Sequence, residues 1–392
     1  MPIDIAKARA DTPACEQLLH FNNAGASLMP EPVVRAIKEH YDLEARIGGY
    51  EAANQQEARW ERVYDATAAL LGCSRDEIAI VENATRAWDM AFYAVPLKAG
   101  DRVLTARAEY VSNYLSLLQV ARKTGAVVEV IPSDASGQVD VAALEKMMDG
   151  RVKLIAVTHI PTNGGLVNPA EAIGAVARKH GVLYLLDACQ SAGQMPLDVN
   201  RLGCDMLSAT GRKFLRGPRA TGFLYVRKGV LERLEPPFID LHAADWTDAS
   251  HYKWRDDARR FENWETNYAT KLGLAVAIDY ALSWGLEAIR ERTFALAAAL
   301  REQLSAIRGV SVHDLGVVKS GIVTFTVESM DADTVREALL AQRMNTSIAR
   351  VQFARLDMGA RGLTAMVRAS VHYYNTDDEV DRFARAVAAL AR

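Results

Sequence analysis

The feature that most limits the fold of this chain is an alternation of short apolar runs with longer amphipathic segments between residues 60 and 230. The runs are apolar on both faces, which is typical of parallel strands covered by helices on both sides. We predict strands over Glu77–Val81, Arg102–Thr105, Val127–Ile131, Val152–Thr158, Val182–Leu186, Met206–Ser208 and Gly222–Val226. The predicted intervening helices are Trp60–Leu71, Arg86–Val95, Ser112–Lys123, Val141–Met148 and Pro169–Lys179. The sequence therefore predicts an α/β fold with a mostly parallel sheet.

Beyond Arg260-Phe-Glu-Asn the pattern changes to that of a smaller α+β unit. A long helical stretch leads into short strands and two further helices, in the order Tyr268–Ile307, Val310–Val312, Gly321–Val327, Asp333–Ala341, Met366–Tyr373 and Asp377–Leu390. We predict a large domain over residues 21–260. Residues 1–20 and 261–392 form the predicted small domain, which the long helix connects to the large one.

Composition narrows the classes of protein that the chain can belong to. Its 392 residues are half hydrophobic and carry a formal net charge of −3, with both signs interspersed, which argues against nucleic acid as the main ligand. No apolar run approaches the length of about eighteen residues that marks a membrane span, and no signal pattern precedes the first domain. We expect a cytoplasmic protein with no membrane or nucleic-acid partner. The widely spaced cysteines predict reduced thiols and no metal site; they are Cys15, Cys73, Cys189 and Cys204.

Two charged residues follow predicted strands. Asp187 ends the apolar run Leu183-Tyr-Leu-Leu, and Lys213 follows Ser208-Ala-Thr-Gly-Arg. A carboxylate at the end of a buried strand is costly unless a cation meets it. The pyridinium nitrogen of pyridoxal 5'-phosphate (PLP) is such a cation, and a nearby lysine can bond the aldehyde of that cofactor. Because Arg212 flanks Lys213, we expect the pKa of the lysine to be depressed. The pair predicts a PLP site at the carboxyl ends of the strands.

Polar residues near Asp187 fit the other edge of the same ring. Gln190 can donate to a phenolic oxygen, and the small Ala188 and Ala192 leave room for a flat ring. Thr162 and Asn163 either supply a second donor to that oxygen or shape the turn before Pro169. Both interpretations stand at this stage.

The segment Glu82-Asn-Ala84-Thr85 lies between a strand and a helix. Backbone amides at a helix N-terminus, with the Thr85 hydroxyl, form a phosphate site; an ordinary helix cap is the alternative. Thr210 and Arg212 complete such a site from the other side.

Two further residues have one functional and one structural interpretation each. Tyr110, just beyond the strand Arg102–Thr105, either stacks on the cofactor or belongs to the core. Arg368 is a charge inside the apolar strand Val367-Arg-Ala-Ser. It either grips the α-carboxylate of a substrate or forms an internal salt bridge.

These residues resemble the class V aminotransferases, in the branch of the cysteine desulfurases and selenocysteine lyases. The resemblance runs from Phe21-Asn-Asn-Ala-Gly to Arg368-Ala-Ser-Val-His-Tyr-Tyr-Asn-Thr-Asp-Asp-Glu-Val-Asp-Arg, and its other highly specific motif is Asp187-Ala-Cys-Gln-Ser-Ala-Gly. It implies a fold-type I PLP-dependent transferase. It also implies a homodimer with the active site at the subunit interface.

The resemblance assigns a role to each site residue. Lys213 bonds the cofactor aldehyde, Asp187 binds the ring nitrogen, and Gln190 binds the phenolic oxygen. Tyr110 stacks on the ring, and Arg368 holds the substrate carboxylate. The implied phosphate ligands are Ala84, Thr85, Thr210, Arg212 and, reaching across from the second subunit, Thr266. The family's threonine falls nearer Glu265 when no gap is allowed.

The departures from the family bear on the reaction. Desulfurases carry a persulfide-forming cysteine on a mobile loop shortly before the carboxylate-binding arginine. Residues 346–362 contain none, and no cysteine lies beyond Cys204. Tyr110 replaces the family's stacking histidine, and Arg212 replaces the histidine before the lysine. These changes resemble C–S lyases such as hercynylcysteine sulfoxide lyase, and also isopenicillin N epimerase.

We therefore expect a PLP-dependent C–S β-lyase that acts on an S-substituted cysteine or a cysteine sulfoxide and releases pyruvate, ammonia and a thiol-type product. Lys213 and Tyr110 are the predicted catalytic residues, and Asn23 and Tyr50 join Arg368 as predicted substrate contacts. A PLP-dependent aminotransferase or amino-acid epimerase is the alternative.

Overall fold

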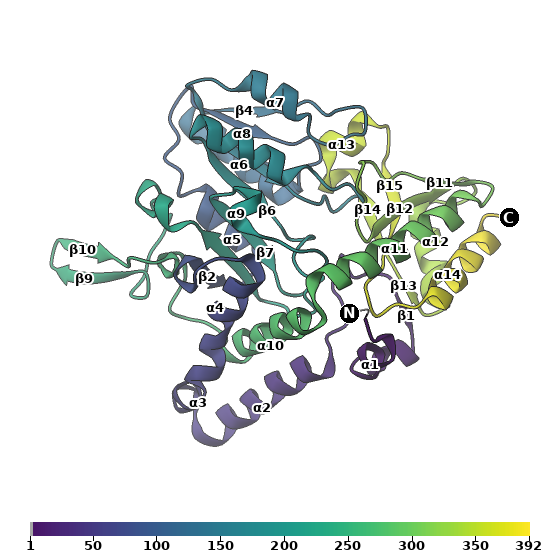
Figure 1. The fold of residues 1–392 in the computed structure, drawn as a ribbon, viewed down its shortest axis with the longest axis horizontal. Coiled ribbons are helices and arrows are strands. Elements are labelled where there is room, and N and C mark those ends of the chain that lie inside the picture. Colours follow the sequence, from purple (N-terminus) through teal and green to yellow (C-terminus); the bar gives the residue numbers. More distant parts are fainter. Residues whose placement is uncertain (1–2) are drawn as a thin grey trace.

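A seven-stranded sheet forms the centre of the large domain in the computed structural model, which describes residues 3–392 (Figure 1). In sheet order the strands are β2 (Ile78–Val81), β8 (Gly222–Val226), β7 (Met206–Thr210), β6 (Leu183–Asp187), β5 (Val152–Thr158), β3 (Arg102–Thr105) and β4 (Val127–Val130). The five strands from β7 to β4 are parallel, and β8 runs antiparallel to both of its neighbours. The predicted α/β fold with a mostly parallel sheet is confirmed.

Helices cover both faces of this sheet because successive residues of its strands point to opposite sides. Ile155, Val157 and Leu186 pack in one buried cluster, whereas Leu154 and Leu185 pack in the other. The first face is covered by α4 (Glu57–Leu71), α7 (Val141–Met147), α8 (Ala170–His180) and α9 (Val199–Leu202). The second face is covered by α5 (Ala84–Phe92) and α6 (Val111–Thr124). These helices include all five that the sequence predicts for this region.

The prediction of one long helix over Tyr268–Ile307 is wrong. The structure has two helices, α10 (Tyr268–Trp284) and α11 (Leu286–Ser305), whose axes meet at 80°. Gly285 between them has φ of +82°, a conformation that favours glycine and ends a helix. No single helix of the described residues is long and apolar enough to cross a membrane; only this bent pair passes that test, on length and composition alone.

The small domain is built on an antiparallel sheet with the order β11 (Val310–Val312), β12 (Ile322–Val327), β15 (Ala365–Ser370) and β14 (Ser347–Arg350). One face of it packs against α11, α12 (Ala332–Ala341) and α14 (Asp377–Leu390). Beside it, β1 (Leu19–His20) pairs with β13 (Met344–Asn345). In contrast, Leu274 and Ile278 of α10 lie in the core of the large sheet. The predicted small domain, which includes all residues from 261 onward, therefore contains one helix, α10, that packs with the large domain.

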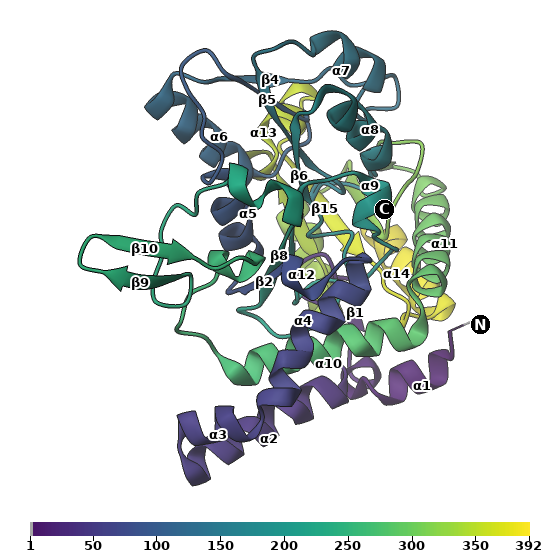
Figure 2. The ribbon, with the colours of Figure 1, turned by 60° about the vertical axis from the view of Figure 1, so that its left-hand side comes forward.

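The remaining elements lie outside the sequence prediction. At the amino-terminal end they are α1 (Ile5–Ala10), α2 (Glu31–Ile47) and α3 (Gly49–Gln55), and α2 and α3 form the lower edge of Figure 2. A hairpin of β9 (Ala244–Asp248) and β10 (His251–Trp254) projects from the large domain (Figure 1). Helix α13 (Arg355–Ala360) precedes β15. The 3₁₀ turns are Pro13–Glu16, Arg75–Glu77, Lys228–Arg233, Ala258–Phe261 and Val351–Phe353.

Candidate active site

A cavity of about 180 Å³ opens at the carboxyl ends of the parallel strands. Thr158, Asp187 and Thr210 are the last residues of β5, β6 and β7, and all three line the cavity. Ligands collect at this edge of a parallel sheet because the strand ends and the following loops meet there. The other lining residues are Asn83, Ala84, Thr85, Tyr110, Ile160, Thr162, Cys189, Gln190, Arg212 and Lys213.

The structure thus places nine sequence-predicted site residues around one cavity: Ala84, Thr85, Tyr110, Thr162, Asp187, Gln190, Thr210, Arg212 and Lys213. Sequence reasoning named no role for Asn83, Thr158, Ile160 or Cys189. For Cys189, its position between Asp187 and Gln190 in the sequence is a signal that it lies at the cavity. In the structure its backbone N–H donates to Asp187 Oδ1 at 2.8 Å. Burial raises the pKa of this thiol, so that it stays protonated.

Asp187 is held in a fixed orientation at the base of the cavity. Its Oδ2 accepts a hydrogen bond from Asn113 Nδ2 at 2.9 Å, and its Oδ1 accepts the Cys189 N–H. The side chain is 5% exposed, and no lysine, arginine or histidine of the described residues forms an ion pair with it. A buried carboxylate without a protein cation is suited to a cationic ligand group.

Lys213 faces the same cavity, and its pKa is lowered. Burial is the main cause, and the charges of Arg212 and Arg368 act in the same direction, while Cys189 and Asp187 oppose them. Of these causes of the lowered pKa, the sequence predicts only the charge of Arg212. A neutral amine is the form that attacks an aldehyde and accepts a proton.

Arg368 of β15 supports the cavity from the small domain. Its Nη1 donates to Thr162 Oγ1 at 2.6 Å and to the Thr162 carbonyl oxygen at 3.0 Å, while its buried Nε has no partner. Burial, followed by the charge of Arg212, lowers its pKa to about 10. Because Arg368 makes no ion pair within residues 3–392, the alternative of an internal salt bridge is wrong. An unpaired buried guanidinium is available to a ligand carboxylate.

Thr162 and Asn163, which the sequence could not separate, point to different neighbours. Thr162 lines the cavity, and its Oγ1 accepts from Gln190 Nε2 at 3.3 Å. Asn163 is 3% exposed and donates from Nδ2 to Asp357 Oδ2 of α13 at 2.7 Å. Of the two, Thr162 is the one placed to contact a ligand in the cavity.

The amino end of α5 borders the cavity as a helix terminus with free N–H groups. Asn83 caps this helix by accepting the Arg86 N–H at 2.9 Å, so the cap and the anion site coexist. Opposite it, Thr210 Oγ1 donates to the Thr221 carbonyl oxygen at 3.1 Å. The Arg212 guanidinium donates to the Gly25 carbonyl oxygen. Asn83, Thr210 and Arg212 all line the cavity, and each has a polar side chain.

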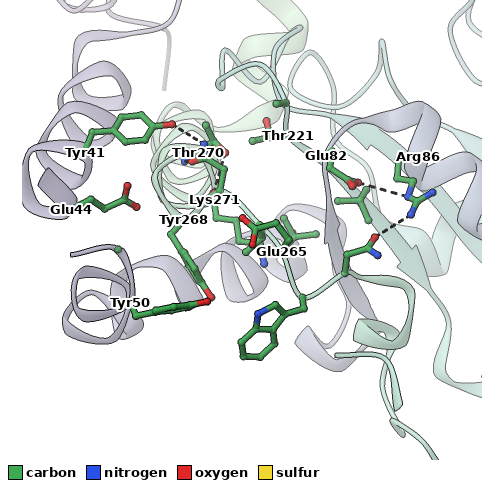
Figure 3. A pocket seen from close by; sticks show the side chains of 18 of the residues that line it. Tyr41, Glu44, Tyr50, Glu82, Arg86, Thr221, Glu265, Tyr268, Thr270 and Lys271 are labelled. Atoms are coloured by element: carbon green, nitrogen blue, oxygen red, sulfur yellow. Dashed lines mark hydrogen bonds and ion pairs between the residues drawn. The ribbon is translucent and has the colours of Figure 1, made fainter. Parts of the chain in front are cut away.

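Tyr50 and Thr266 do not lie at this cavity within one chain. Both line a second cleft of about 880 Å³ between α2, α3, the amino end of α10 and the segment before it. Figure 3 shows Tyr50 and Tyr268 on one side of this cleft and Glu82 and Arg86 on the other. The family resemblance assigns Thr266 to the cofactor of a second subunit, and its absence from the Lys213 cavity of its own chain is compatible with that prediction.

Asn23, another predicted substrate contact, does not line the Lys213 cavity in this structure. Asn23 is fully buried, and its Nδ2 donates to the carbonyl oxygens of Ser370 and His20. Its Oδ1 accepts from the Tyr374 hydroxyl. Every polar atom of the side chain is therefore used in joining the amino-terminal segment to the small domain.

The cavity matches the chemical groups of PLP one by one. Asp187 complements a ring nitrogen, the Lys213 amine an aldehyde, and the α5 terminus with Thr85 a phosphate. The buried Gln190 Oε1 and Arg368 Nε have no protein partner, as expected where a polar ligand completes the site. No metal-binding group of His, Cys, Asp and Glu occurs in the described part of the chain. This fold and this cavity define a PLP-dependent enzyme of fold type I.

Comparisons with known proteins agree. The Aminotransferase class-V family profile matches residues 19–383. A probable cysteine desulfurase of Methanothermobacter thermautotrophicus is 30% identical over 98% of this chain and 97% of its own length. The apo structure of the cysteine desulfurase from Thermococcus onnurineus NA1 has a TM-score of 0.93 at 28% identity, covering 100% of this chain and 98% of that one. The cystine C–S lyase C-DES shares the fold, with a TM-score of 0.85 at 23% identity over 96% of this chain and 99% of that one.

The chain therefore belongs to the class V aminotransferase family, in its cysteine desulfurase-like branch. The predicted family and the predicted PLP cofactor are confirmed, and the chain is a PLP-dependent enzyme of the C–S lyase type.

Proposed function

We propose that this enzyme is a PLP-dependent C–S β-lyase whose substrate is an S-substituted cysteine or a cysteine sulfoxide. Elimination followed by reaction with water gives pyruvate and ammonia, together with a thiol from an S-substituted cysteine or a sulfenic acid from a cysteine sulfoxide. The observation that carries the proposal is a cavity lined by Lys213 and Asp187, with Arg368, which makes no ion pair, bonded to Thr162 of the cavity wall, and with a segment without cysteine before Arg368. The first three features support amino-acid chemistry on PLP, and the last determines how sulfur leaves.

The segment before Arg368 supports release of sulfur with its substituent. Residues 346–362 have no cysteine, so no thiolate on this segment accepts a sulfur atom. Helix α13 is also anchored: Asp357 is 4% exposed, accepts from Asn163, and pairs with Arg361 at 3.2 Å. A fixed segment suits a wall of the substrate site better than an arm that carries sulfur outward.

Each site residue has a separate role in the proposed β-elimination. Arg368 binds the α-carboxylate and so orients the Cα–H bond. Lys213, whose pKa is lowered mainly by burial, takes the proton from Cα in its neutral form. Asp187 keeps a positive charge at the ring nitrogen. Bound PLP supplies the electron sink that stabilises negative charge at Cα. The Tyr110 hydroxyl, at the cavity wall, donates a proton to the leaving sulfur.

The relatives named in the comparisons carry related chemistry. Two relatives at 30% identity are named as probable cysteine desulfurases, and C-DES is described in complex with its reaction product cysteine persulfide. C–S cleavage on a cysteine skeleton is common to both descriptions. The absence of a cysteine in residues 346–362 favours elimination over sulfur transfer for this chain.

A homodimer with the active site at the subunit interface is part of the proposal. Thr266 lines the second cleft and not the Lys213 cavity of its own chain, as a residue that serves a neighbouring subunit would. Sedimentation of the purified protein tests the dimer. Mixing Lys213→Ala with Thr266→Ala tests the shared site: activity returns in the mixed dimer only if Thr266 acts across subunits.

The experiment for the reaction is an assay of pyruvate and thiol release from a panel of S-substituted cysteines, their sulfoxides and cysteine. Release of both products from at least one S-substituted member, absent in Lys213→Ala, supports the proposal and identifies the leaving group. Turnover of free cysteine alone would contradict the proposed substrate class. No pyruvate from any member would favour the second candidate, an aminotransferase or epimerase that uses the same Lys213 and Arg368.

A further inference from the structure

A second buried carboxylate lies behind the cavity and takes no part in the chemistry described above. Glu109 is 3% exposed and sits directly before Tyr110, at the amino end of α6. Its neighbours come from three elements: Thr105 ends β3, Thr158 ends β5, and Asn113 is in the first turn of α6. Glu109 therefore spans adjacent strand ends at the edge where the cavity opens.

All contacts of Glu109 come from hydrogen-bond donors. Its Oε1 accepts from Tyr110 N and Asn113 Nδ2, each at 2.9 Å, and from the Thr158 hydroxyl. Its Oε2 accepts from Thr158 N at 3.1 Å and Thr105 Oγ1 at 3.2 Å. Such a site suits a carboxylate, or a carboxylic acid whose O–H donates to a threonine hydroxyl, because the other three donors are N–H groups. A glutamine would leave at least one N–H facing another N–H.

Asn113 connects this carboxylate to Asp187. The same Nδ2 atom lies 2.9 Å from Glu109 Oε1 and 2.9 Å from Asp187 Oδ2. An amide nitrogen has two hydrogens, so Asn113 donates one to each carboxylate. Because both neighbours are acceptors, the amide cannot turn its oxygen toward either without repulsion. Glu109 thus fixes the direction of the Asn113 amide, and Asn113 fixes Asp187.

We propose that Glu109 and Asn113 are positioning residues for the cofactor: the Glu109–Asn113–Asp187 chain holds the Asp187 carboxylate against the ring nitrogen. The same Glu109 oxygen also holds the backbone of Tyr110, the predicted stacking residue. One buried carboxylate therefore orients both the partner of the ring nitrogen and the residue predicted to stack on the ring face. The inference rests on the role of Asp187 in the proposed function.

The test measures PLP affinity and the absorption spectrum of bound PLP in Asn113→Leu and Glu109→Gln. Asn113→Leu keeps the approximate shape and removes both donors. Losing a hydrogen bond to a charged group weakens PLP binding by about 10- to 100-fold and shifts the visible band of the bound cofactor. Asn113→Gln, which retains a donor amide, restores part of the affinity if the bridge is what matters.

Ser116→Ala is the matched control. Ser116 lies on the same helix, is 5% exposed, and bonds Trp88 and the Asn113 carbonyl oxygen without touching either carboxylate. It should lower the melting temperature and leave PLP affinity and the spectrum unchanged. If Asn113→Leu behaves like Ser116→Ala, the positioning role is overturned and the cluster is structural. If Asp187→Ala also leaves PLP affinity and the spectrum unchanged, the assignment of Asp187 itself fails.

Discussion

Arg368 Nη1 lies 2.6 Å from Thr162 Oγ1, and the same hydroxyl oxygen accepts a hydrogen bond from Gln190 Nε2 at 3.3 Å. This contact joins the small domain to the wall of the PLP cavity through one threonine. The guanidinium has no carboxylate partner among residues 3–392, as its proposed role in binding a substrate carboxylate requires. The arrangement explains why a charge stands within the otherwise apolar strand β15.

Replacing Arg368 with alanine should raise KM and lower kcat, because the lost contact both binds the α-carboxylate and orients the Cα–H bond. The expected loss in kcat/KM is about a hundredfold, or about 3 kcal/mol. Steady-state kinetics on the best substrate measure it. The Arg368→Ala variant loses no ion pair but loses two hydrogen bonds to Thr162, so a modest fall in the melting temperature of the protein is expected as well. An unchanged KM would instead return Arg368 to a structural role.

Borohydride reduction of the PLP-loaded protein should attach the cofactor permanently to Lys213. Peptide mass spectrometry locates the added mass, and Lys213→Ala should carry none and lose the visible absorbance. Lys271, a second buried lysine, lies in the other cleft beside Glu262 and should stay unmodified in the wild type. Modification of any other lysine would show that the cofactor lysine is assigned to the wrong residue.

Glu109 predicts a pH dependence of folding stability. Burial, aided by the charge of Asp187, raises its pKa from 4.5 to about 7, against the hydrogen bonds from Thr158, Asn113 and Tyr110. Between pH 4.5 and pH 7 the folded protein therefore binds more protons at this site than the unfolded chain. This contribution is fully present below pH 4.5 and is lost as pH rises through 7.

Chemical denaturation of wild type and Glu109→Gln across that range isolates the effect, because the buried histidines contribute equally to both. The wild type should lose roughly 3 kcal/mol relative to the variant as pH rises from the lower to the upper limit. A difference that does not vary with pH would show that Glu109 titrates normally in the folded protein.

Asp357 anchors the segment that replaces the family's mobile loop. Asp357→Ala should cost about 2 kcal/mol of unfolding free energy, because Asn163 and Arg361 lose their acceptor. It should also expose residues 351–362 to limited proteolysis. Asp333→Ala is the control, since its pair with Arg350 in the same region is solvent-exposed and contributes little. Equal proteolysis of both variants would contradict the anchoring role.

Sequence patterns predict the site residues that stand at or just after the ends of strands. Asp187 and Thr210 end buried runs, so a parallel sheet brings them to one edge, and the structure places them in one cavity. The sequence does not predict the role of Glu109, because Ala-Glu-Tyr resembles a solvent-exposed turn. Only the fold brings Thr105 and Thr158 beside it. The signal available was an acid after a strand with an asparagine four residues later.

Some features of the structure depend on three-dimensional contacts that the sequence does not show. Asn23 lies in a family-like motif, yet its amide is used within the chain by Ser370 and His20. Apolar periodicity continues through Gly285, which hides the 80° turn between α10 and α11. Tyr50, a predicted substrate contact, lines the second cleft and not the Lys213 cavity, a separation that no pattern in the sequence indicates.

The central claim, C–S β-elimination, is tested most directly by following one turnover series in deuterated water by NMR, with an S-substituted cysteine and the PLP-loaded enzyme. Our account predicts equimolar pyruvate, ammonium and sulfur-containing product, all abolished in Lys213→Ala. Deuterium at Cα without loss of the sulfur substituent would contradict it in favour of an epimerase. Conversion of the substrate to its keto acid with the C–S bond intact would contradict it in favour of an aminotransferase.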